Sequence, residues 1–270
     1  MEYLFGKDIF LSSDQGVAAF STDYLDDTDA SGSVNDFTNG EPFARDLLSV
    51  FPSRRSLIDF GTATGHVPLT MRRAGMLAIG LEGSDKPKQR DLGAWGEMPD
   101  IVHVCDIGKP FLIQDVEGKG VMFDFVTSWG VFEHVPLPDF DECLKNVLRL
   151  MHDNSFGVLN IDLGYNPADD FHMLWRHFEP NCGPEEVPAK HAFLRDRLSS
   201  FFDVIYATGA SEKELIVIPP TRDLVGEEKA VIRHWNYCRP TAPERACNER
   251  LAIHPHSGRS YWWVKKRRAA

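Results

Sequence analysis

Cysteine, basic charge and long apolar runs are all scarce in this chain of 270 residues. The five cysteines are scattered and form no C-x-x-C pair, which argues against a disulfide framework or a structural zinc site and favours a reducing compartment. No apolar run approaches membrane-spanning length, and the acidic start at Met1-Glu2-Tyr3 is unlike a signal peptide. We therefore expect a soluble, cytoplasmic protein with no membrane partner. The cysteines are Cys105, Cys143, Cys182, Cys238 and Cys247.

Basic residues are outnumbered, because 29 lysines and arginines face 40 aspartates and glutamates and leave a net charge of −11. A protein that follows a nucleic-acid strand needs a basic surface to neutralise phosphates, so we expect no extended nucleic-acid footprint. The clearest basic cluster, at 265–268, follows a strand-like segment and is interpreted as a solvated chain end.

The rest of the chain is organised around residues 56–85. The apolar run 57–60 predicts a buried strand, and the small residues that follow it, from Gly61 to Gly65, predict a tight turn. Residues 66–74 have helical periodicity, and 76–81 form a second apolar run that ends at Glu82. Strand, turn, helix, strand and acid together are typical of the βαβ half of a nucleotide-binding sheet.

This turn lacks the G-x-G-x-x-G pattern of NAD and FAD sites, since Ala63 and His66 stand where its second and third glycines belong. Asp59, at the tip of the first strand, also opposes a pyrophosphate. Like charges about 4 Å apart repel by roughly 4 kcal/mol at an effective dielectric constant near 20. A positively charged ligand without phosphate meets no such repulsion.

The residues of this turn resemble motif I, (D/E)-x-G-x-G-x-G, of the class I S-adenosylmethionine-dependent methyltransferases. Asp59, Gly61 and Gly65 match it, and Ala63 replaces the middle glycine. Glu82 stands where the family's acidic residue binds both ribose hydroxyls, and a carboxylate can accept from both members of a diol. The resemblance implies S-adenosyl-L-methionine as cofactor and S-adenosyl-L-homocysteine as product. The alternative is another doubly wound α/β domain whose first turn is glycine-rich.

Two later segments also resemble this family. In the sequence CDIGKPF, Asp106 matches an acid that reaches the adenine amino group, although a buried acid at a strand tip is also a common loop cap. The run VMFDFVTSWGVFEHV matches the loop between cofactor and acceptor, so Trp129 and Val131 are expected to line the methyl-transfer channel. The cofactor-binding residues implied by the resemblance are Asp59, Gly61, Thr62, Ala63, Gly65, Glu82, Asp106, Ser128 and Trp129.

The pair Glu133-His134 raises the question of a metal site, because some relatives hold a divalent ion on Glu and His here. That cluster needs another acid three residues upstream, where this chain has Gly130, so we expect no metal. His134 is interpreted either as a structural histidine or as a residue near the acceptor.

The fold class implied is a doubly wound α/β domain with a mainly parallel seven-stranded sheet whose last strand is antiparallel. Further strands are predicted at 101–105, 121–128, 156–163 and 202–208, and either 214–218 or 260–265 closes the sheet. The polar residues 1–40 predict a flexible or lid-like arm. Residues 41–270 are predicted to form the methyltransferase-like domain, with insertions at about 164–190 and 219–259.

The first insertion begins at the carboxyl edge of the sheet and is expected to cover the acceptor. It carries His172, Trp175, His177 and Phe178, and helical spacing would place a histidine beside an aromatic wall. His172 or His134 is therefore the candidate catalytic proton acceptor, with a purely structural role as the alternative.

We expect methyl transfer to an O, N or C atom of a small-molecule acceptor, because both insertions are rich in aromatic residues. A methyltransferase for RNA or protein, and a non-catalytic relative that acts as a binding or scaffolding module, stay open as alternatives. The oligomeric state stays open too.

Overall fold

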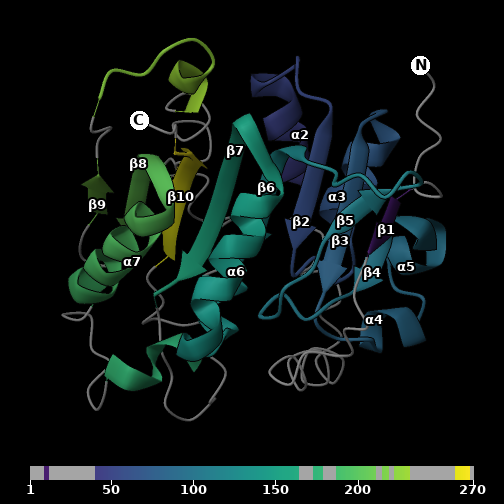
Figure 1. Ribbon diagram of the computed structural model, residues 1–270, viewed down its shortest axis with the longest axis horizontal. Coiled ribbons are helices and arrows are strands. Elements are labelled where there is room, and N and C mark those ends of the chain that lie inside the picture. Colours follow the sequence, from purple (N-terminus) through teal and green to yellow (C-terminus); the bar gives the residue numbers. More distant parts are fainter. Residues whose placement is uncertain are drawn as a thin grey trace.

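The computed structural model describes residues 9–11, 40–163, 173–178, 187–210, 215–218, 222–231 and 259–267. At its centre is an eight-stranded sheet with the order β4-β3-β2-β6-β7-β10-β8-β9 (Figure 1). The strands are β2 (Ser56–Phe60), β3 (Leu77–Glu82), β4 (Val102–Val104), β6 (Phe123–Trp129), β7 (Met151–Asp162), β8 (Phe202–Ala210), β9 (Leu215–Ile218) and β10 (Arg259–Lys266).

The sheet is parallel from β4 to β7, and its last members are antiparallel. Strand β10 lies between β7 and β8 and is antiparallel to both. The expected seven-stranded sheet closed by an antiparallel strand is thus confirmed, with 260–265 as the closing segment. The other candidate segment, β9, is an eighth strand that pairs antiparallel with β8 at the edge of the sheet.

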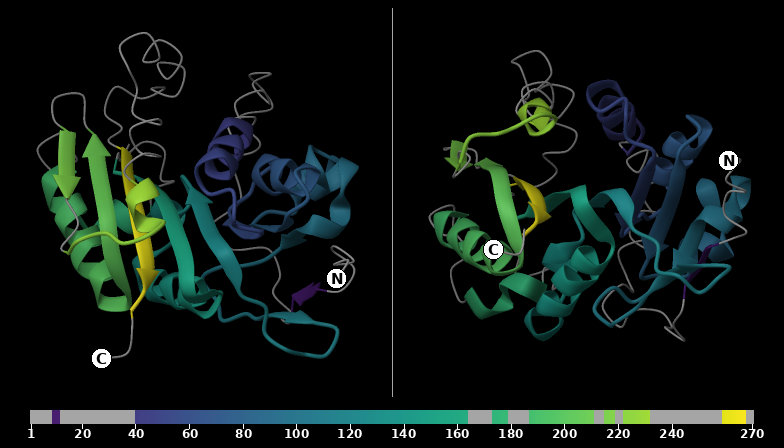
Figure 2. Two further views of the ribbon diagram at one scale, coloured as in Figure 1. Left: turned by 90° about the horizontal axis from the view of Figure 1, so that it is seen from above. Right: turned by 45° about the horizontal axis from the view of Figure 1, so that its top comes forward.

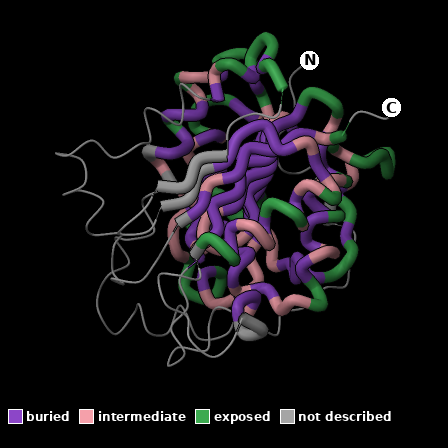
Figure 3. The backbone as a smooth tube through the Cα atoms, turned by 90° about the vertical axis from the view of Figure 1, so that its left-hand side faces the viewer, coloured by how far each residue is buried: buried purple, intermediate pink, exposed green. Residues whose placement is uncertain are grey.

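Helices cover both faces of the sheet, as Figure 2 shows. One face packs on α6 and α7, through an apolar stripe in α6 that recurs at helical spacing, Phe140, Cys143, Leu144 and Val147. The other face packs on α2 and α3. Because both faces are covered, the central strands are buried along most of their length, with Asp153 and Asn154 near the start of β7 exposed (Figure 3). The helices are α2 (Gly40–Val50), α3 (His66–Arg73), α4 (Lys86–Gln89), α5 (Ala94–Glu97), α6 (Leu137–Arg149) and α7 (Val187–Phe201), with 3-10 turns η2 (Pro99–Ile101), η3 (Phe132–His134) and η4 (Met173–Phe178).

Part of the N-terminal arm pairs with the body of the protein. Strand β1 (Ile9–Leu11) pairs antiparallel with β5 (Ile113–Asp115), in the connection between β4 and β6. The rest of residues 1–39 lies outside the described residues, as does most of the second expected insertion. The predicted boundaries at residue 40, 164–190 and 219–259 stay predictions.

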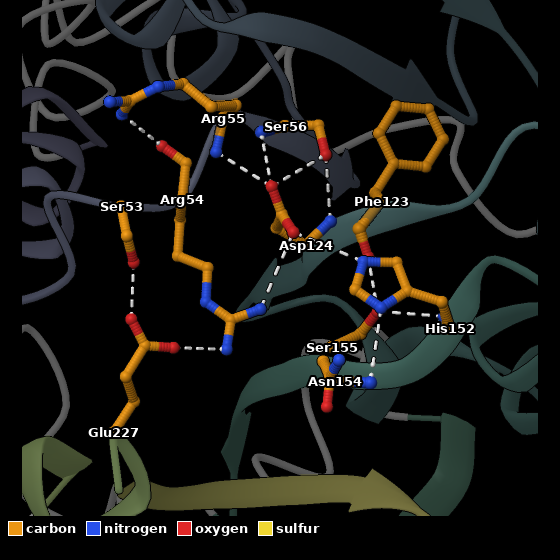
Figure 4. A network of polar contacts seen from close by, with 10 residues as sticks. All are labelled: Ser53, Arg54, Arg55, Ser56, Phe123, Asp124, His152, Asn154, Ser155 and Glu227. Carbon is orange, nitrogen blue, oxygen red and sulfur yellow. Dashed lines mark hydrogen bonds and ion pairs between the residues drawn. The ribbon is translucent and has the colours of Figure 1, made fainter.

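A polar network ties the amino ends of β2 and β6 together (Figure 4). The carboxylate of Asp124 accepts from the backbone N–H groups of Arg55, at 2.7 Å, and Ser56, at 3.0 Å. It also contacts Arg54 and the Nε2 atom of His152. Burial alone would raise the pKa of Asp124, but these hydrogen bonds and the charge of Arg54 hold it below its usual value. Asp124 therefore joins strands, and it lies at the opposite edge of the sheet from the carboxyl ends of the parallel strands.

Candidate functional site

Strand register gathers the sequence-predicted site residues at the carboxyl edge of the sheet. Phe60, the last residue of β2, lies opposite Leu81 of β3 on one side and Ser128 of β6 on the other. Glu82 follows Leu81, and the turn that starts at Gly61 follows Phe60. The ends of these three neighbouring strands are where open α/β sheets bind ligands.

The glycine turn is held by backbone hydrogen bonds. The N–H of Thr62 donates to the carbonyl oxygen of Leu81 at 2.9 Å, and the N–H of Gly65 donates to that of Thr62 at 2.8 Å. Gly61 and Gly65 have φ angles of +67° and +77°, in the left-handed region where glycine is favoured.

Both glycines are also required by packing within the chain. A Cβ atom added at Gly61 would lie 2.2 Å from a methyl carbon of Val131, and one at Gly65 would lie 2.5 Å from the Cβ of Ala94. Val131 thus fills the space beside Gly61, so the loop after β6 packs directly on the turn. A bulky residue at Gly61 would therefore disturb the fold as well as ligand binding. The sequence pattern does not indicate this crowding.

Ala63 has a left-handed conformation, with φ of +49°, and hydrogen bonds hold both its N–H and its carbonyl group. Its N–H donates to Oε2 of Glu82 at 2.7 Å, and its carbonyl oxygen accepts from Nε1 of Trp95 at 2.9 Å. Left-handed backbone costs a non-glycine residue about 1–2 kcal/mol, so these contacts offset strain at the centre of the turn. Sequence reasoning misses Trp95 as a site residue. Its one sequence signal is that it is the sole aromatic residue in the polar stretch 83–100.

Asp59, which is buried, and Glu82, which is half-buried, face the same side of the sheet beneath this turn. Asp59 accepts a hydrogen bond of 2.6 Å from the hydroxyl of Thr127, directly opposite on β6. Burial raises the pKa of Asp59 to about 7, against the lowering effect of Thr127 and Thr62, and the charge of Glu82 raises it further. Burial also raises the pKa of Glu82, although N–H groups of Ser84 and Ala63 lower it. Because both carboxylates are costly to ionise without a partner, the site favours a cation.

The remaining residues of the predicted cofactor set have varied surroundings. Asp106 is buried, accepts from the N–H of Gly108 at 3.0 Å and pairs with Nζ of Lys109 at 2.8 Å, so it does cap its own loop. Ser128 is buried at the end of β6. The ring of Trp129 lies against Phe43 and a tyrosine of β10, on the side of β6 away from Glu82. A contact of these residues with cofactor stays a prediction.

The two candidate proton acceptors differ in what the structure describes. His134 is half-buried in η3, the turn that follows β6, whereas His172 lies outside the described residues. Trp175 does not form the expected aromatic wall, because its side chain is fully buried. It packs on Phe193, and its Nε1 donates to the carbonyl oxygen of Asp162 at 2.8 Å. Trp175 therefore anchors η4 to the end of β7.

Neither a metal cluster nor a membrane span is found in the described residues. In that part of the chain, no three His, Cys, Asp or Glu side chains are grouped as metal ligands. Over the same ranges, no helix has the length and apolar character that crossing a membrane requires.

Sequence comparison identifies the family. A family model described as a methyltransferase domain matches residues 39–212, more than half of the chain. The chain belongs to the methyltransferase domain family. No curated protein matches it. The family assignment brings S-adenosylmethionine as the cofactor, in agreement with the resemblance of motif I.

Solved methyltransferases are similar to this chain at low identity. An S-adenosylmethionine-bound aminopentose methyltransferase, CalS10 from Micromonospora echinaspora, is 18% identical over 50% of this chain and 55% of its own, with a TM-score of 0.37. A TehB-like methyltransferase from Corynebacterium glutamicum is 14% identical over 90% and 94%, with a TM-score of 0.46. The plantazolicin methyltransferase BpumL, in complex with S-adenosylhomocysteine, is 13% identical over 92% and 93%, with a TM-score of 0.48. The chain thus spans about half the length of the first of these proteins, and their acceptors are properties of those proteins alone.

The residues of this methyltransferase-family site fit the cofactor. S-adenosylmethionine carries a sulfonium and an ammonium cation, one carboxylate and no phosphate, and its net positive charge suits the two acids Asp59 and Glu82. The Glu82 carboxylate accepts N–H groups from Ala63 and Ser84, and the backbone of Gly83 also hydrogen-bonds to it. A carboxylate has about four lone-pair sites, so Glu82 retains capacity for a ribose hydroxyl.

Proposed function

We propose that this protein transfers the methyl group of S-adenosylmethionine to an O, N or C atom of a small-molecule acceptor. The observation that carries the proposal is a pair of acids, buried Asp59 and half-buried Glu82, beneath a turn in which Ala63 is held left-handed. Such a pair of acids opposes a phosphate ligand and favours a sulfonium one.

Each residue has a distinct task in this proposal. Glu82 accepts a hydrogen bond from a ribose hydroxyl and holds the glycine turn through the N–H of Ala63. The pKa of Asp59 is about 7, so both its neutral and its ionised forms are populated near neutral pH. A bound cation stabilises the ionised form. Thr127 orients that carboxylate through its hydroxyl.

When bound, the cofactor supplies an electrophilic methyl carbon whose bond to sulfur breaks as the acceptor atom attacks. The chain aligns the two reactants and excludes water. Well-oriented reactions reach effective molarities as high as about 10⁵–10⁸ M. Where the acceptor atom carries a proton, a base must remove it. His134 lies on the turn after β6 and is the described candidate for this role, with His172 as the second candidate.

A small acceptor is supported by charge and by side-chain type. The net charge of −11 opposes a nucleic-acid strand. Partly buried aromatic residues, Trp129 and Tyr261, lie beside the cofactor strands, and such residues favour a small, partly apolar ligand. The experiment below is set against two alternatives: a methyltransferase for RNA or protein, and a non-catalytic binding module.

Calorimetric titration of Glu82→Ala tests the cofactor assignment. We expect S-adenosylhomocysteine to bind about 1.5–3 kcal/mol more weakly to this variant, because hydrogen bonds to a charged group are lost. The control is Glu117→Ala, which changes an exposed glutamate in the turn after β5 and leaves the affinity unchanged. Preferred binding of NAD by the wild type, or equal affinities in the three proteins, contradicts the assignment. Release of S-adenosylhomocysteine from S-adenosylmethionine with an acceptor panel then separates an enzyme from a binding module.

A further inference from the structure

Trp129, Asn160 and Tyr261 form one row across the carboxyl edge of the sheet. Trp129 of β6 lies opposite Asn160 of β7, and Asn160 lies opposite Tyr261 of β10. Residues directly opposite each other project from the same face of a sheet, here the face covered by α2. The row lies beside the glycine turn, since the residue before Trp129 is opposite Phe60.

Phe43 of α2 joins Trp129 and Tyr261 in what we name the aromatic corner. The ring of Trp129 lies 5.2 Å from that of Phe43, at 59°, and 5.5 Å from that of Tyr261, at 71°. Strands β6 and β10 are two spacings apart, about 9–10 Å, so the two rings lean toward each other across β7. Trp129 and Tyr261 are half-buried, so both retain exposed surface. Their near-perpendicular rings can receive a flat group, with one ring stacking on it and the other meeting its edge.

Asn160 is the polar member of the row. The residue is 2% exposed, and its Nδ2 atom makes no hydrogen bond within the described part of the chain. A buried amide left unpaired lowers stability, and its neighbours in the row are rings, whose π faces are weak acceptors. An unpaired buried amide beside the cofactor strands is typical of a group that binds a ligand and has no ligand bound.

We propose that the aromatic corner and Asn160 bind the acceptor, and that the acceptor is a planar aromatic ring bearing a hydroxyl group. The ring stacks in the corner and the hydroxyl pairs with the Asn160 amide. A hydroxyl both donates and accepts, so it matches either orientation of that amide. This inference rests on the proposed function, because it names the substrate class of the same site.

A sugar fits this arrangement less well. Sugars present hydroxyl groups around the whole ring, and their binding needs several polar partners. The three side chains of the aromatic corner, Phe43, Trp129 and Tyr261, offer rings, and the row adds one amide, that of Asn160. A flat aromatic ring makes use of both the face and the edge that the corner offers.

Calorimetry on the full chain, with and without saturating S-adenosylhomocysteine, tests the inference. The probes are 1-naphthol, naphthalene, which lacks the hydroxyl, cyclohexanol, which lacks the planar ring, and D-glucosamine. We expect 1-naphthol to bind at least about tenfold more tightly than cyclohexanol or D-glucosamine. Asn160→Leu is expected to weaken 1-naphthol about tenfold, to leave naphthalene unchanged and not to lower the melting temperature. Asn154→Leu, at an exposed position near the other end of β7, is the matched control and changes neither affinity.

Tyr261→Leu gives an independent readout, with about fivefold weaker binding of both naphthalene and 1-naphthol. The inference is overturned if D-glucosamine binds more tightly than 1-naphthol, if Asn160→Leu keeps wild-type affinity for 1-naphthol, or if it loses stability without losing affinity. The last result makes Asn160 a structural residue. Failure to bind S-adenosylhomocysteine contradicts the proposed function separately, because probe binding is also measured without it.

Discussion

Replacing Asp59 with asparagine should stabilise the protein without ligand and weaken its binding of cofactor. Asparagine keeps the shape of the side chain and can still accept from Thr127, but it cannot ionise. The pKa of Asp59 is raised from 3.8 in the unfolded chain to about 7 in the fold, chiefly by burial. The unfolded state therefore releases this proton first as pH rises, and the wild type loses stability between about pH 4 and pH 7. The asparagine variant does not share that loss.

The expected size follows from the shift. A rise of about three pKa units corresponds to about 4 kcal/mol at most, since one unit is about 1.4 kcal/mol. Between pH 5 and pH 8 the wild type should lose about 2–3 kcal/mol of unfolding free energy, because the rest of the total is already lost by pH 5. Asp59 is 4% exposed, so screening by solvent reduces this figure little.

Urea denaturation of wild type and Asp59→Asn at pH 5 and pH 8 measures the difference directly. The advantage of the variant should grow by about 2–3 kcal/mol from the lower pH to the higher. Other titrating groups cancel, because they are common to both proteins. An advantage that is equal at the two pH values, or a variant that is less stable at pH 8, refutes the claim that burial of this carboxyl is costly.

Three further substitutions test other parts of the structure. Gly61→Ala should lower the free energy of unfolding by about 2–4 kcal/mol, since its Cβ would overlap Val131, and Val131→Ala in the same chain should recover part of that loss in chemical denaturation. Trp95→Phe should weaken S-adenosylhomocysteine by about 0.5–1.5 kcal/mol in calorimetry, because it frees the carbonyl of Ala63, and an unchanged affinity would remove Trp95 from the site. Asp124→Asn should cost about 1–3 kcal/mol of stability at pH 7 with cofactor affinity intact. The pKa of Asp124 is lowered in the fold, so the difference from wild type should begin to shrink near pH 4 and continue to shrink as pH falls through that lowered pKa.

The arrangement of the site could be predicted only as far as local patterns reach. The strand 57–60, the turn after it and the acid at Glu82 follow from apolar runs, small residues and spacing, and all are observed. The contact of Trp95 with Ala63 joins residues 32 positions apart, and no periodicity marks it. The crowding at Gly61 likewise depends on Val131, which only the register between β2 and β6 brings there. Local sequence patterns carry no information about the register between strands that are far apart in the chain.

The first insertion shows the same limit. Spacing indicates that Trp175 shares a helix face with other aromatic residues, but spacing cannot tell a ligand-facing side from a buried one. The hydrogen bond from Trp175 to Asp162 and the contact with Phe193 decide the matter, and both partners come from other elements.

Titration of S-adenosylmethionine into wild type and Asp59→Asn at pH 6 and pH 8 tests whether the acid pair Asp59 and Glu82 binds a cationic methyl donor. With a pKa of about 7, Asp59 is about one-tenth ionised at pH 6 and nine-tenths ionised at pH 8. We expect wild-type affinity to rise about tenfold between these pH values and the affinity of the variant to rise much less. Absence of binding at both pH values, or an equal rise in the two proteins, contradicts binding of the donor by this acid pair.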